Sequence, residues 1–150
     1  VTVRKINQKF EISLIIEKSQ FSQILYNEFS IPLLEQYLQN ARRLTYLDLS
    51  WSSLRPKTVR KLLSIISESR QLQYINFSWN NFCDIKSSDK EQLEVSMYIG
   101  QLIKRNRSLI HVDFTSTGLT RMIIKELGSQ IRKAPSLLCI HLSGNPGLAA

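Results

Sequence analysis

Two short segments of the sequence carry side chains that could do chemistry, and both have the same internal spacing. His111-Val112-Asp113 and Cys139-Ile140-His141 each place two polar side chains two residues apart, which in a strand puts both on one face. Imidazole, thiolate and carboxylate groups are the ligands that zinc takes in proteins, and a cysteine beside a histidine can form a nucleophilic thiol. If the two segments lie on neighbouring strands, they could form a metal site or a catalytic pair.

Geometry weighs against that chemistry. Side chains that stand on a flat sheet diverge instead of converging, and two ligands at i and i+2 on a strand lack the tight loop that builds structural zinc sites. We therefore expect a polar, partner-facing surface at this cluster, with no metal, no cofactor and no nucleophile. The sequence also contains no phosphate-binding loop, nucleophile elbow or metalloprotease motif, so we expect no enzyme.

The elements that would position these residues follow from an internal repeat. Four copies of one pattern begin at Leu44, Leu72, Leu109 and Leu137, at intervals of 28, 37 and 28 residues, and a weaker copy begins at Glu11. Each copy has apolar residues at its first, fourth and sixth positions and near its eleventh, which predicts a short strand with one buried face. Helical spacing follows each strand. A unit of this size cannot bury its own apolar face, so the copies must stack.

The length of 150 residues allows one domain and argues against two. A polar insertion near residues 83–91 accounts for the longer interval, and Thr58, Asp89 and Thr120 are the candidate helix caps. We expect the chain to be a fragment of a longer protein. Within it we predict an irregular first repeat or cap at 1–43 and repeats at 44–71, 72–108, 109–136 and 137–150.

The four copies LTYLDLSWSSL, LQYINFSWNNF, LIHVDFTSTGL and LLCIHLSGNPGL resemble the leucine-rich repeat pattern L-x-x-L-x-L-x-x-N-x-L, and their period resembles the ribonuclease-inhibitor-like subclass. The resemblance implies an α/β solenoid of about four to five repeats, a right-handed arc with a parallel sheet on its concave side and helices on its convex side. Asn80 and Asn145 keep the conserved asparagine of that pattern, whereas Ser52 and Thr117 replace it, which weakens the hydrogen-bond ladder without removing it.

In that register the third and fifth residues of each copy face out of the sheet, and the eighth lies at the rim where the strand turns. The predicted partner-binding residues are those that these positions expose: Tyr46, Asp48, Trp51, Tyr74, Asn76, Trp79, His111, Asp113 and His141. Exposed tryptophan and tyrosine beside polar groups are typical of binding hot spots. The two tryptophans could equally fold inward and cap the core, and the sequence leaves both orientations open.

Basic residues give the chain a net charge of +8 and recur just before successive strands. Stacked repeats would gather them into a basic edge made of Arg42, Arg43, Arg70, Lys104, Arg105 and Arg107. Cations at helix C-termini complement the helix dipole, and we favour this local reason for their placement. The functional alternative is an anionic partner, RNA or an acidic protein. Nucleic acid is the minority interpretation, because no stacking platform exists beyond the tryptophan pair.

These observations favour a protein–protein interaction module or scaffold subunit that binds through the concave face. Similar eukaryotic repeat proteins serve cytoskeletal and ciliary complexes, ubiquitin-ligase adaptors and innate sensors, and we lean towards a structural subunit of a cytoskeletal or ciliary assembly. Two cysteines fit a reducing compartment, and no apolar run approaches the roughly 20 residues that span a bilayer. We therefore expect a cytoplasmic, intracellular protein with no membrane association.

Overall fold

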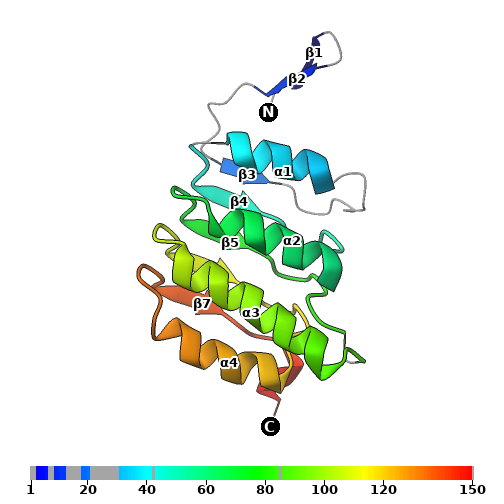
Figure 1. Ribbon diagram of the computed structural model, residues 1–150, viewed down its shortest axis with the longest axis vertical. Coiled ribbons are helices and arrows are strands. Elements are labelled where there is room, and N and C mark those ends of the chain that lie inside the picture. Colours follow the sequence, from blue (N-terminus) through cyan, green and yellow to red (C-terminus); the bar gives the residue numbers. More distant parts are fainter. Residues whose placement is uncertain are drawn as a thin grey trace.

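The fold has two layers, a parallel sheet and a row of helices that covers one of its faces (Figure 1). The computed structural model describes residues 3–6, 9–12, 18–20, 31–41, 43–84 and 86–149. The sheet runs in the order β3-β4-β5-β6-β7. Its strands, each three residues long, are β3 (Lys18–Gln20), β4 (Tyr46–Asp48), β5 (Tyr74–Asn76), β6 (His111–Asp113) and β7 (Cys139–His141).

The strand register confirms the predicted alignment of the last four copies. Tyr46 pairs with Tyr74, Tyr74 with His111, and His111 with Cys139, so the third residues of these copies form one column across the sheet. The first copy was aligned wrongly. Lys18, not Ser13, pairs with Tyr46, which moves that copy five residues towards the C-terminus.

The misalignment of the first copy can be traced to the elements that precede β3. Glu11, the predicted start of the first copy, belongs to an antiparallel hairpin of β1 (Val3–Ile6) and β2 (Lys9–Ile12). Ser13 and Ile15, which that alignment placed on the exposed face, lie outside the described residues. The copy's apolar positions, Leu14 and Ile16, follow the hairpin in the sequence and have the spacing of a repeat strand, so periodicity favoured them over the polar residues of β3.

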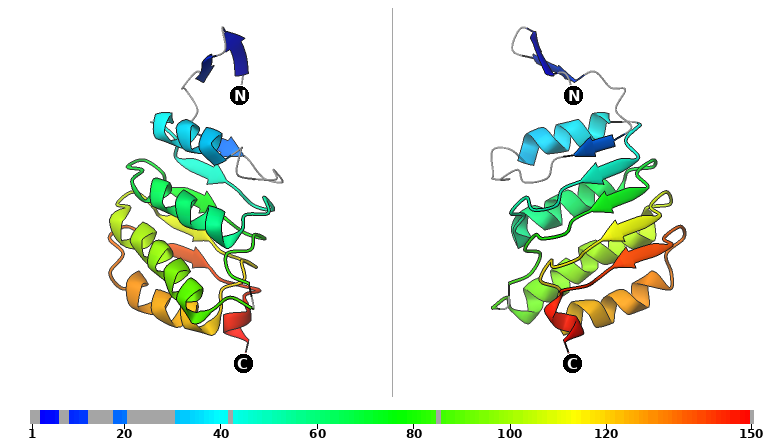
Figure 2. Two further views of the ribbon diagram at one scale, coloured as in Figure 1. Left: turned by 45° about the vertical axis from the view of Figure 1, so that its right-hand side comes forward. Right: turned by 180° about the vertical axis from the view of Figure 1, so that it is seen from behind.

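The helices stack in chain order on the convex side, and Figure 2 shows them behind the sheet when the molecule is seen from its strand side. They are α1 (Ile31–Asn40), α2 (Pro56–Ser67), α3 (Asp89–Arg105) and α4 (Arg121–Ile131), and the 3-10 helix η1 (Pro146–Leu148) follows β7. Within the described residues, no helix combines the length and the apolarity needed to cross a membrane.

The helix caps show which structure the polar insertion near residues 83–91 forms. Ser88, not Asp89, caps α3, and its side chain and backbone form a reciprocal capping box with Glu91. The prediction at Thr120 is confirmed, because its hydroxyl accepts a hydrogen bond from the Ile123 N–H. Thr58 lies inside α2, which begins at Pro56. The insertion therefore supplies a loop and part of a helix that, at 17 residues, is longer than α2 and α4 at 12 and 11.

The core lies between the two layers and is built from the predicted apolar positions. Leu47, Phe77 and Phe114 are fully buried on successive strands and turns. Phe77 stacks on Phe114 with ring centroids 5.6 Å apart, and Phe82 meets both edge-on at 5.3 and 5.7 Å. Edge-to-face and offset contacts of this kind add to the free energy gained by burying the rings.

Asparagine side chains tie consecutive turns together. The Asn80 Oδ1 accepts from the backbone N–H groups of Ser52 and Leu54 at 3.1 and 3.0 Å, and its Nδ2 donates to the carbonyls of Leu49 and Phe77 at 2.8 Å. Asn145 repeats this pattern two repeats further on, with bonds to Thr117 and Leu119. Buried turn groups that the repeat backbone cannot pair are thus satisfied by side chains from the neighbouring repeat.

Candidate interaction surface and histidine–cysteine cluster

The fifth position has a structural task in three successive repeats. The carboxylate or amide oxygens of Asp48, Asn76 and Asp113 accept hydrogen bonds at 2.7–2.9 Å from the backbone N–H two residues further on. This Asx turn ends each strand and starts the rim. The prediction that the Asp48 side chain is exposed is wrong: it is only 7% exposed, because it folds onto the turn.

The third position faces solvent to different degrees along the sheet. Tyr74 is 40% exposed, and its ring lies 5.8 Å from that of His111. Tyr46 is half-buried. Burial, and then the nearby Asp48 carboxylate, raises the pKa of the Tyr46 hydroxyl above its ordinary value, so this side chain is a neutral hydrogen-bonding group at physiological pH. Both tyrosines present aromatic surface towards the concave side.

The two tryptophans face solvent and stack on each other. Trp51 and Trp79 are 54% and 50% exposed, and their rings lie 4.5 Å apart at an interplanar angle of 9°. They do not cap the core. Here we call this pair the tryptophan stack. It is an exposed apolar surface held in one orientation by the two neighbouring turns.

The backbone under the stack is in the left-handed region, which bulky residues rarely adopt. The φ angle is 55° at Trp51 and 59° at Trp79, and the same column continues with Ser116 at 52° and Gly144 at 70°. A non-glycine residue in this conformation costs roughly 1–2 kcal/mol. Two tryptophans therefore occupy a position where glycine would be less strained.

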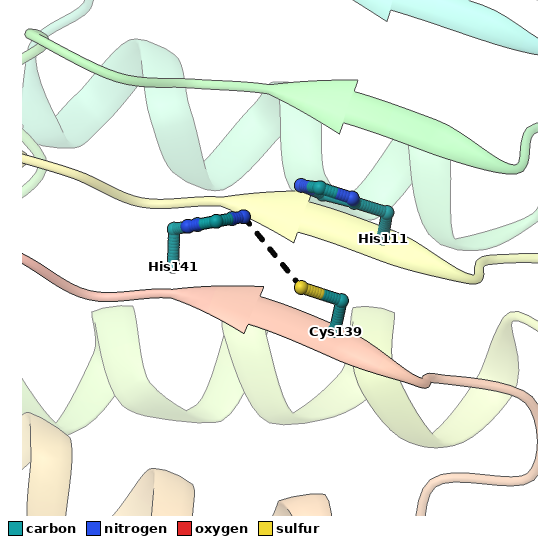
Figure 3. Close-up of side chains that lie close together, drawn as sticks. All are labelled: His111, Cys139 and His141. Atoms are coloured by element: carbon teal, nitrogen blue, oxygen red, sulfur yellow. Dashed lines mark hydrogen bonds between the residues drawn. The ribbon is translucent and has the colours of Figure 1, made fainter.

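The histidine–cysteine cluster lies beside Tyr74 on the same face. In Figure 3 the side chains of His111, Cys139 and His141 all project from β6 and β7 towards one another. Their ligand atoms lie within 4.8 Å of each other, the Cys139 Sγ is 3.5 Å from the His141 Nε2, and the two imidazole rings stack at 4.8 Å. Asp113, the fourth predicted member, is instead bound to its own turn.

This geometry overturns the expectation that the cluster's side chains diverge. Cys139 pairs directly with His111, which makes His141 the diagonal neighbour of His111. Long side chains reach across the diagonal of a sheet. The imidazole of His141 therefore leans back over β6. The sequence placed these residues in adjacent columns, but side-chain torsions decide whether they meet.

The structure brings three members of the predicted basic edge together. Arg70, Arg105 and Arg107 line one surface depression with Glu68, and Arg105 forms an exposed ion pair with Glu68 at 3.5 Å. Arg43 and Lys104 are exposed, and Arg42 lies outside the described residues. The helix-dipole explanation holds for α3, whose last turn carries Lys104 and Arg105, whereas α1, α2 and α4 have no basic residue in their last turn.

Comparison with known proteins identifies the architecture. No protein-family model matches the sequence, and no curated protein matches it. Among solved structures, the tropomodulin C-terminal domain of Caenorhabditis elegans is similar, with a TM-score of 0.67 and 14% sequence identity. The match covers 86% of this chain and 74% of that domain, which has a leucine-rich repeat fold. The fold is a leucine-rich repeat arc. Identity this low shows the fold alone, and the surface chemistry of this repeat arc has to be interpreted from its own residues.

Proposed function

We propose that this leucine-rich repeat arc is a protein-interaction module, and that its partner binds along the concave face and the adjacent rim. The tryptophan stack is the observation that carries the proposal. Both rings are half-exposed, both stand on strained backbone, and no packing of the described core requires them. Large rigid aromatic side chains supply binding area at low entropic cost and dominate interface hot spots.

The surrounding surface supports a protein partner. Tyr74 adds exposed aromatic area on the neighbouring column, and the fifth-position side chains of Asn76 and Asp113 are polar but engaged with their own turns. We infer that Tyr46, Tyr74, Trp51 and Trp79 contribute the apolar contacts, and that Asn76, His111, Asp113 and His141 form the polar surround. An apolar centre with a polar surround is the usual anatomy of a specific interface.

Several finer assignments belong to the same proposal. The spacing of 28 residues between hydrogen-bonded turn partners supports the ribonuclease-inhibitor-like subclass. An intracellular, non-enzymatic role as a scaffold subunit, the cytoskeletal or ciliary setting and the division into repeats remain predictions. The similar domain carries the name tropomodulin, which makes a structural assembly a reasonable first place to look for the partner.

The test is affinity capture from cells that express the chain, with partners identified by mass spectrometry. The binding variant is Trp51→Ala/Trp79→Ala. The matched control is Leu93→Ala/Met97→Ala, because these side chains are equally exposed, at 49% and 55%, but lie on α3 of the convex layer. Partners lost with the first variant and kept with the second support the proposal. Partners kept by both variants refute it.

A second candidate function rests on the depression that Arg70, Arg105 and Arg107 line, which suits an anionic partner. Binding of this kind weakens steeply with salt, because it releases counterions. The variant Arg70→Glu/Arg107→Glu and a capture repeated at higher salt separate the two candidates. A partner that survives high salt but needs the tryptophan stack belongs to the concave face.

A further inference from the structure

The histidine–cysteine cluster gathers nearly all of the metal-binding nitrogen and sulfur side chains that the chain possesses. The sequence of 150 residues has two histidines and two cysteines. Both histidines and one of the cysteines meet at a single place, although His111 and Cys139 are 28 residues apart in the sequence. The other cysteine, Cys83, is buried in the core. Such convergence on one spot of the concave face is the pattern of a ligand set.

We propose that His111, Cys139 and His141 form a zinc-binding site with one coordination position left open. Tetrahedral zinc with Zn–S of about 2.3 Å and Zn–N of about 2.0 Å places a sulfur and a nitrogen ligand about 3.5 Å apart. The Cys139 Sγ and the His141 Nε2 are 3.5 Å apart. All three ligand atoms already lie within 4.8 Å of one another, so the His111 ring closes the site by moving about 1.5 Å or less.

The ligand chemistry selects the metal. One thiolate and two imidazoles suit zinc and other borderline-soft transition metals, whereas calcium and magnesium require oxygen ligands. When zinc binds, the Cys139 thiol gives up its proton and the sulfur takes the metal in its place.

The solvent exposure of the three ligands and the rigidity of their backbone also suit a zinc site. His111 and Cys139 are half-buried and His141 is exposed, so an ion reaches the site from the concave side without any opening of the core. The ligands come from two hydrogen-bonded strands, which fixes their main-chain positions before metal binds. The open position faces the concave space, where it would hold water or a side chain of a bound partner. The zinc site itself does not depend on that partner.

The competing explanation is a metal-free cluster, in which the imidazoles stack and the thiol forms a weak hydrogen bond. Cobalt(II) titration of the purified chain, kept reduced with a phosphine, separates the two. A zinc site gives one equivalent of bound cobalt, with the intense visible bands of four-coordinate cobalt and a thiolate-to-cobalt charge-transfer band. Zinc then displaces the cobalt and removes both signals.

Variants identify the ligands. Cys139→Ser should abolish the charge-transfer band although Cys83 is still present, and His111→Gln and His141→Gln should each weaken zinc binding by at least about tenfold. Tyr74→Phe is the control, because Tyr74 contacts the His111 ring but supplies no ligand. Circular dichroism and thermal melting of each variant establish that it is folded. A charge-transfer band that is absent from the wild type, or that survives in Cys139→Ser, overturns the proposal.

Discussion

The asparagine ladder allows a sharp test of the repeat architecture, through the substitution Asn80→Ala. Asn80 is 6% exposed, and its amide makes five hydrogen bonds to backbone groups of two consecutive turns. The substitution leaves two N–H groups and three carbonyls without those partners. A hydrogen bond contributes about 1 kcal/mol net, and an unpaired buried group costs more. We expect a loss of about 3–5 kcal/mol.

That loss is large beside the roughly 5–15 kcal/mol that stabilises an ordinary domain. Equilibrium urea unfolding, followed by circular dichroism and extrapolated linearly to water, measures it directly. Asn81→Ala is the matched control, because it removes the same side chain from the next residue, which is exposed. Its effect should stay within about 0.5 kcal/mol. If the two variants lose equal stability, the ladder does not hold the turns together.

Two further substitutions at Asn80 separate its donor and acceptor roles. Asn80→Asp keeps an oxygen for the N–H groups of Ser52 and Leu54, but it places a carboxylate against the carbonyls of Leu49 and Phe77. It should therefore be no more stable than Asn80→Ala. Asn80→Ser should fall between Asn80→Ala and the wild type, because Ser52, at the same repeat position, still donates to a turn carbonyl.

Three other predictions concern the rim, a turn and a helix cap. Trp79→Gly should be about 0.5–1 kcal/mol more stable to urea than Trp79→Ala, reversing the usual order, because alanine keeps the cost of φ 59° and glycine does not. Gly118→Ala should lose more than about 1 kcal/mol in the same assay, since φ is 77° and a Cβ would lie 2.5 Å from the Cys83 carbonyl oxygen. Hydrogen bonds from the Ser88 backbone and hydroxyl lower the pKa of Glu91. Its contribution to stability is therefore complete above the ordinary glutamate pKa of about 4.3 and disappears as pH falls through the lowered value, so Glu91→Gln should flatten the acid side of the stability–pH curve.

The sequence predicted the strand register correctly in the four repeats that have apolar residues at the pattern positions. The columns from Tyr46 to Cys139 are confirmed, because a strand slipped by one residue would turn its apolar side chains out of the core. The alignment of the first repeat was wrong because its strand lacks the apolar pattern of the others. Ser19 pairs with Leu47, so the strand has a polar residue at a position where the pattern requires an apolar one. The pattern was matched instead to the apolar residues 14–16, which come just before this strand in the sequence.

The candidate site was predicted less well, because it depends on properties that spacing does not contain. Spacing placed Trp51 and Trp79 in the rim column but could not choose between solvent and core. Gly144 in the same column was the available hint, since a glycine there indicates a left-handed turn. The convergence of His111 with His141 depends on side-chain torsions across a diagonal, and no periodicity encodes those.

Different positions of the repeat have different structural roles, and the positions without such a role are the ones where we expect a partner to bind. The apolar positions fill the core, the ninth position holds the turns through Asn80 and Asn145, and the fifth ends β4, β5 and β6 with an Asx turn. The third and eighth columns take no part in these tasks, and neither does His141, the fifth-position residue of β7. The eighth carries the tryptophan stack, and the third leads from Tyr74 to His111 in direct ring contact. Because His111 is also the ligand that must move to close a zinc site, metal binding would act on the tyrosine next to it. An aromatic protein-binding surface and a metal site would then be neighbouring parts of one concave face.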